Sequence, residues 1–256
     1  MERKIWAIDF DVMGPISIER SIRFRQEKGF NQHQFYSDIE LSRSPYGFKA
    51  TITAYADTID IAETVAYVYF GRMRDILSLT NDIPIQLNKN EGKFNITRNF
   101  TSRRILTKSD IIIAFKMARE FESEQPKLLR AIGWYSKGKL SHNTFDQFLA
   151  FWNVIEILAK EFHTVTNRTD IGVKNQIYQC FIDHFGEIEN WNLPEKWIDD
   201  MYDKRNGIVH GGEDTTLEAI KETSKVIPVL EKTSKILINR IIDANYNRSE
   251  FRYFDF

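Results

Sequence analysis

The chain has one cysteine, Cys180, and no long apolar segment. A single cysteine excludes an intrachain disulfide framework and is typical of proteins in a reducing compartment. Cys180 lies in the apolar helical pattern of residues 177–181, which predicts a buried structural thiol. No apolar run approaches the roughly 20 residues that cross a bilayer, and no apolar signal region follows the charged N-terminus. We therefore expect a cytoplasmic protein with no membrane partner.

The motifs of common nucleotide and metal enzymes are also missing. The 256 residues hold no glycine-rich phosphate loop, no His-Glu-x-x-His pair and no Cys-x-x-Cys pair. A net charge of −1 gives no global basic field that attracts nucleic acid, so any such binding needs a local patch. Asp9 and Asp11 share one face of a predicted strand, where solvated carboxylates are a simpler explanation than a metal site. We expect neither a metal nor another cofactor.

The first hundred residues are typical of a small mixed α/β domain. Apolar residues alternate with polar ones, and β-branched and aromatic residues are enriched, which predicts strands. Strands are predicted at residues 4–12, 16–18, 22–25, 35–41, 48–55, 83–87 and 93–97. Asp57 or Thr58 precedes a helical pattern that ends near Asn81. Antiparallel strands with one helix laid on them would bury one face of a sheet.

Helical patterns replace the strand patterns after the basic stretch 101–104, which predicts a domain boundary near Ile105. The expected fold class is α+β, with an N-terminal α/β domain over 1–104 and an all-α bundle over 105–256. Helices of the bundle are predicted at residues 109–121, 127–136, 144–162, 172–185, 194–210 and 215–241. Glycines at 138, 186 and 211 are predicted to end three of them. The tail after these helices is rich in aromatic residues.

The stretch 203–212 carries the candidate chemistry. Arg205, Asn206 and His210 lie within six residues on a predicted helix, and a pair of glycines follows. An arginine holds a phosphate through two parallel hydrogen bonds, and a histidine suits proton transfer near neutral pH. Asn206 and His210 are four residues apart and so share a helix face. A purely structural alternative has Arg205 paired with an acidic neighbour such as Glu156, while His210 stabilises the helix C-terminus.

Three stretches of the helical half carry a family resemblance, namely residues 128–138, 148–158 and 202–211. They resemble the HEPN superfamily (higher-eukaryote and prokaryote nucleotide-binding domains), and within it the ApeA-like branch. The last stretch is similar to the Arg-polar-x-x-x-His signature of the family, with Asn206 at the polar position. The N-terminal region resembles the sheet-containing leader of some relatives, which implies no activity.

The resemblance implies a helical bundle that forms a homodimer, with the signature helices of two protomers facing each other across one site. Active relatives are metal-independent endoribonucleases, many in anti-phage defence or toxin systems. In an active member Arg205, Asn206 and His210 would cleave RNA through attack of the ribose 2′-OH on phosphorus. Glu156 and Asp203 would support these three side chains.

Lys204, Arg23 and Arg25 are candidate contacts to the phosphates of RNA. A half-exposed strand explains Arg23 and Arg25 equally well. Inactive relatives serve as binding or scaffold modules, so the alternative function is a non-catalytic module that binds a nucleotide or a protein. In that case the N-terminal domain would be the sensor of a phage-derived or cellular activator.

Overall fold

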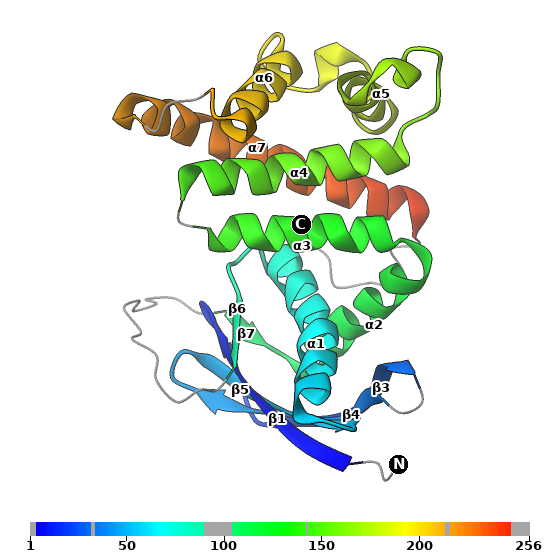
Figure 1. The fold of residues 1–256 in the computed structure, drawn as a ribbon, viewed down its shortest axis with the longest axis vertical. Coiled ribbons are helices and arrows are strands. Elements are labelled where there is room, and N and C mark those ends of the chain that lie inside the picture. Colours follow the sequence, from blue (N-terminus) through cyan, green and yellow to red (C-terminus); the bar gives the residue numbers. More distant parts are fainter. Residues whose placement is uncertain (1–3, 32–33, 90–103, 142, 213–215, 247–256) are drawn as a thin grey trace. The chain divides into compact units, whose positions relative to one another are not determined.

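The computed structural model describes residues 4–31, 34–89, 104–141, 143–212 and 216–246. The chain divides into two units, Met1–Glu120 and Phe121–Asp255. The first unit contains an antiparallel sheet, whereas the described elements of the second are helices (Figure 1). The α+β class is therefore confirmed. Within the described residues, no helix combines the length and the apolar character that crossing a membrane requires.

The first unit is built on a five-stranded sheet with the order β3-β4-β5-β1-β6, antiparallel throughout. The strands are β1 (Lys4–Met13), β3 (Ile22–Asn31), β4 (Gln34–Ser44), β5 (Gly47–Ala56) and β6 (Gln86–Lys89). Alternation along β1 and β5 buries Phe10 and Ile52 on one face. On the other face Thr51 Oγ1 donates to Asp9 Oδ1 at 2.7 Å, so this carboxylate belongs to a solvated sheet surface.

Helix α1 (Ile59–Asn81) covers the buried face of this sheet (Figure 1). It begins where predicted, since the Thr58 side chain accepts a hydrogen bond from the Ile61 amide. The Phe70 ring of α1 stacks on Phe10 of β1, with the ring centroids 6.2 Å apart. The apolar face of the strands and the apolar face of α1 therefore pack together in one core.

Helix α2 (Lys108–Glu124) is shared between the two units. It is capped at Thr107 rather than at the predicted Ser109. Thr107 Oγ1 accepts from the Asp110 amide, and the Asp110 carboxylate accepts from the Thr107 amide. The division after Glu120 falls later than the predicted boundary near Ile105. The reason is that the Phe115 ring of α2 packs against the aromatic side chains of the first unit, namely Phe24, Tyr36 and Phe70.

Local sequence patterns predict the remaining strands only in part. Strand β2 (Ile16–Ile18) lies where predicted, but its parallel partner β7 (Arg104–Leu106) was not predicted. The predicted strand at 83–87 begins only at Gln86, because the Ile83 amide donates to the Ser78 carbonyl and completes the C-terminus of α1. The predicted strand at 93–97 lies outside the described residues.

The second unit is organised around α4, the most apolar helix of the chain. Its helices are α3 (Pro126–Leu140), α4 (Thr144–Phe162), α5 (Val173–Phe185), α6 (Trp197–His210) and α7 (Leu217–Asn245). Helix α4 has its predicted bounds and packs against the other four (Figure 1). The Asn143 side chain caps it by accepting from the amides of Phe145 and Asp146.

Cys180 lies in the core of this unit, as predicted. Its side chain is fully buried on α5. Burial raises the pKa of the Cys180 thiol to about 12, and the charge of Asp183 adds to the effect. The thiol is therefore neutral at physiological pH and packs as a small apolar group.

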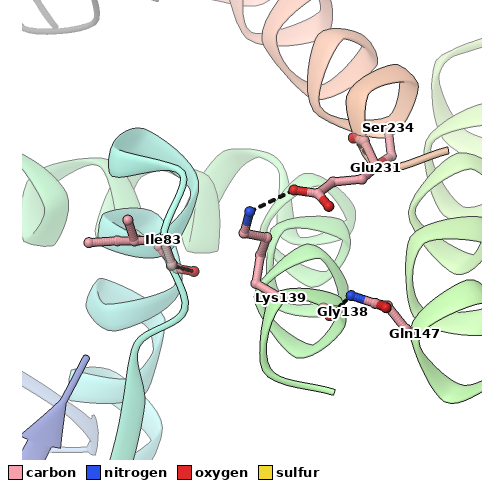
Figure 2. A network of polar contacts seen from close by, with 7 residues as sticks. Ile83, Gly138, Lys139, Gln147, Glu231 and Ser234 are labelled. Atoms are coloured by element: carbon pink, nitrogen blue, oxygen red, sulfur yellow. Dashed lines mark hydrogen bonds and ion pairs between the residues drawn. The ribbon is translucent and has the colours of Figure 1, made fainter. Parts of the chain in front are cut away.

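Gly138 does not end α3, in contrast to the prediction, because the helix continues to Leu140. A Cβ atom at Gly138 would lie 2.6 Å from Cε1 of the fully buried Phe151 on α4. The glycine therefore permits a close approach of two helices. Figure 2 shows the polar contacts around it: Gln147 Nε2 donates to the Gly138 carbonyl at 3.3 Å, and Lys139 pairs with Glu231 of α7 at 2.6 Å.

We expect Gly138→Ala to destabilise the protein by about 1–3 kcal/mol, because the added methyl group overlaps the Phe151 ring. Ordinary helix propensity acts in the opposite direction by about 1 kcal/mol. Urea unfolding monitored by circular dichroism measures the difference. Gly71→Ala in α1 is the control, since the nearest atom to its Cβ is 4.0 Å away and no loss is expected. Equal stability of the two variants would contradict the close-approach argument.

Candidate functional site

Helix α6 carries the three candidate side chains and is anchored by its N-terminal apolar residues. It begins at Trp197 rather than around the predicted Pro194, because Lys196 has a left-handed backbone with φ 59°. Its end is as predicted: Gly211 has φ 73° and directly follows His210. Trp197 is buried, so the helix is fixed to the body at one end and presents its last turn to solvent.

An ion pair joins α6 to α4. Arg205 Nε lies 3.2 Å from Glu156 Oε1, and the two side chains are only 26% and 11% exposed. The Nε–H bond does not point at this oxygen well enough to make a hydrogen bond, so the contact is mainly Coulombic. The directed hydrogen bond to Glu156 Oε1 comes instead from Trp152 Nε1, at 2.8 Å. Glu156 thus balances its partial burial with two partners.

The guanidinium of Arg205 is also tied to its neighbour on α6. Its Nη1 donates to Asn206 Oδ1 at 3.1 Å. In the described part of the chain, Nη2 makes no hydrogen bond. The group is therefore held along its Nε side and linked to Asn206, while its outer edge has donors left for an anion.

His210 is exposed on the last turn of α6, one turn beyond Asn206. Among the described residues it has no hydrogen-bond or ion-pair partner. An exposed ring without a structural partner is free to exchange a proton with a bound molecule.

Asp203 does not join this arrangement. Asp203 lies two positions before Arg205, which places the two about 200° apart around a helix, since each residue turns by about 100°. It has no hydrogen bond or ion pair to Arg205, Asn206 or His210 within the described ranges. The charge of Asp203 acts instead on Lys174 of α5. The hydrogen bond to Asp199 raises the pKa of Lys174, and Asp203 adds to that effect.

A polar cluster that the sequence did not predict lies between α5 and α6. Lys174 Nζ lies 2.7 Å from Asp199 Oδ1, and the Tyr178 hydroxyl donates to Asp199 Oδ2 at 2.8 Å. These two hydrogen bonds lower the pKa of Asp199, whereas burial raises the pKa of Tyr178 to about 12. No local pattern could reveal this cluster, because it depends on how two helices pack.

Trp152 was also missed as a polar partner, although a signal for it exists. Trp152 and Glu156 are four residues apart on a predicted helix and so share a face. The apolar character of the surrounding sequence predicts a packing role instead. The structure shows that the indole both packs and donates a hydrogen bond.

The three weaker candidates for RNA contact have partners of their own. Lys204 Nζ donates to Thr223 Oγ1 of α7 at 3.3 Å. Arg23 forms an ion pair with Glu40 on the adjacent strand, and Arg25 pairs with Glu27 at 2.6 Å. All four charged side chains of these two pairs are exposed. Such surface pairs are weak, so they remain open to competition by another anion.

No group of three or more His, Cys, Asp or Glu side chains in the described residues is arranged to hold a metal ion. Comparison of the chain with protein families, with curated proteins and with solved structures gives no match.

Proposed function

We propose that this protein is a HEPN-type endoribonuclease that cleaves RNA without a metal ion, using Arg205, Asn206 and His210 of α6. One observation carries the proposal. Arg205 is fixed from behind by Glu156 and linked to Asn206, while His210 at the open end of the same helix has no structural partner among the described residues. An exposed histidine without a bonded partner is available for proton transfer to a bound molecule.

Each side chain has a role that its surroundings support. The free edge of Arg205 would bind a non-bridging phosphate oxygen and offset the charge that develops on pentacoordinate phosphorus. Asn206 would keep the guanidinium in that orientation through its 3.1 Å hydrogen bond to Nη1. His210 would take the proton of the ribose 2′-OH as a general base. The 2′-oxygen then bonds to phosphorus, and the bond to the 5′-oxygen breaks.

The leaving 5′-oxygen needs a proton, and His210 of a second protomer would supply it. The proposed active form is accordingly a homodimer in which the two α6 helices face each other. The products are a 2′,3′-cyclic phosphate and a 5′-hydroxyl end, and no water is consumed in this step. The proposed substrate is single-stranded or looped RNA in the cytoplasm. The proposed setting is anti-phage defence or a toxin-type stress response, with a phage-derived or cellular activator acting through the N-terminal unit.

The test is a cleavage assay of the purified full chain on total cellular RNA, with and without EDTA. We expect cleavage at the same rate in both conditions, because the proposed groups are all side chains. The new 3′ ends should resist poly(A) tailing until polynucleotide kinase removes a cyclic phosphate. Binding to a 2′-deoxy analogue should weaken as salt increases, since phosphate contacts release counterions.

Three outcomes would contradict the proposal in different ways. Loss of cleavage with EDTA would show that a metal takes part in the reaction. Products with free 3′-hydroxyl ends would exclude attack by the 2′-OH. No cleavage by a folded dimer, even in extracts of phage-challenged cells that supply an activator, would favour the non-catalytic binding module.

A further inference from the structure

The indole N–H of Trp152, in the second unit, donates a hydrogen bond that has no part in the proposed reaction. Trp152 is fully buried on α4, one helical turn before Glu156. Its Nε1 lies 2.8 Å from Glu156 Oε1, the same oxygen that lies 3.2 Å from Arg205 Nε. One carboxylate oxygen therefore receives a directed hydrogen bond from α4 and an undirected charge contact from α6.

The two contacts differ in how strongly they restrict the orientation of the Glu156 carboxylate. A Coulombic contact without a well-aligned N–H tolerates several orientations of the carboxylate. A short hydrogen bond from a confined ring favours one of these carboxylate orientations. The Trp152 ring is confined in this way, because its centroid lies 6.3 Å from that of Trp197 and 6.5 Å from that of Tyr202, both on α6. The hydrogen bond from Trp152 therefore restricts the orientation of the carboxylate that faces Arg205.

We infer that Trp152 is a positioning residue for Arg205, acting through the orientation of the Glu156 carboxylate. The inference rests on the proposed function only for its catalytic consequence. The arrangement of Trp152, Glu156 and Arg205 has a measurable effect whether or not the protein cleaves RNA. Without the indole donor, Glu156 would turn among other orientations and the guanidinium would lose its fixed edge toward phosphate.

The informative variant is Trp152→Phe, which keeps an aromatic ring and removes the N–H donor. Trp197→Phe is a matched control, because Trp197 is also buried in the same aromatic cluster. Its indole N–H makes no hydrogen bond in the described part of the chain, so this exchange removes the same atoms without touching Glu156. A difference between the two variants isolates the hydrogen bond from the packing.

The first readout is the rate at which phenylglyoxal modifies Arg205 in the full-length protein, followed by peptide mass spectrometry with exposed Arg130 as the internal reference. Phenylglyoxal reacts with the guanidinium nitrogens, which a well-placed carboxylate partner shields from the reagent. We expect severalfold faster modification of Arg205 in Trp152→Phe and a smaller change in Trp197→Phe, which loosens the same aromatic cluster but keeps the hydrogen bond from Trp152 to Glu156. Glu156→Gln should increase the rate at least as much, since it removes the charge itself.

The second readout is RNA cleavage. Trp152→Phe should lower kcat about tenfold, the effect of losing one hydrogen bond to a charged group, while Trp197→Phe, which loses packing alone, should lower it less. Equal Arg205 modification rates in all variants would overturn the inference. So would equal changes in Trp152→Phe and Trp197→Phe, because these would assign the effect to packing. A wild-type protein that cleaves no RNA, but shows the modification difference, would refute the proposed nuclease and leave the positioning role intact.

Discussion

Alanine in place of His210 is expected to reduce RNA cleavage by about 10²–10⁴-fold, the range that a lost general acid or base costs. Stability should hardly change, because the ring is exposed and no described residue binds it. The melting temperature should stay within about 2 °C of wild type, as for a typical surface substitution. Cleavage of a fluorescent single-stranded RNA and a thermal scan of the same preparation provide the two measurements.

Val209→Ala is the matched control for this variant. Val209 precedes His210, is 47% exposed and has no group that transfers protons. It should cleave RNA at the wild-type rate. If His210→Ala also cleaves at that rate, His210 is not the general base. If His210→Ala unfolds at a much lower temperature than Val209→Ala, the histidine has a structural role at the end of α6.

Arg205→Ala is expected to have two effects, one on catalysis and one on stability. Cleavage should fall by about 10²–10³-fold, as when one donor to a developing oxyanion is removed. The free energy of unfolding should fall by about 1–3 kcal/mol, because the Glu156 carboxylate, 11% exposed, keeps only the Trp152 hydrogen bond. This loss is smaller than the loss from breaking a fully buried ion pair, because Arg205 itself is about one-quarter exposed. Urea unfolding measures the second effect.

A double variant separates the two effects. Arg205→Ala with Glu156→Gln removes both charges, so we expect stability to recover while cleavage stays lost. Arg205→Lys keeps a positive charge but lacks the planar fork, so it should retain most of the stability and little of the activity. Full activity in Arg205→Lys would show that the site needs only a positive charge. No recovery of stability in the double variant would show that the Arg205–Glu156 contact contributes little to the fold.

Local sequence patterns were sufficient for most elements of the fold. The alternation of β1 and β5 and the apolar period of α4 predicted their positions, because these elements bury a face that repeats every two or every 3.6 residues. The cap of α1 was foreseen as Asp57 or Thr58, and the Thr58 hydroxyl accepts from the Ile61 amide three residues later. In each case the partners are close neighbours in sequence.

Where the sequence predictions differ from the structure, contacts between residues far apart in the chain give the reason. Gly138 predicted a helix end, but the Phe151 ring of another helix explains the glycine. Strand β7 has three residues and exists through its pairing with β2, far away in the chain. The assignment of the first part of α2 to the sheet unit depends on Phe115 meeting rings from three other elements. None of these contacts leaves a periodic trace in the sequence.

The candidate site likewise combines features that the sequence predicts with contacts that depend on the packing of the helices. The sequence by itself determined that Arg205, Asn206 and His210 share one helix that ends at Gly211, because spacing and a left-handed glycine are local properties. It left open whether Arg205 pairs with Glu156, and it grouped Asp203 with the site. Only the tertiary structure decided that Glu156 and Trp152 meet Arg205 while the charge of Asp203 acts on Lys174. The physical reason is that a charge takes its partner from whichever helix packs beside it, and that packing is set by the whole core.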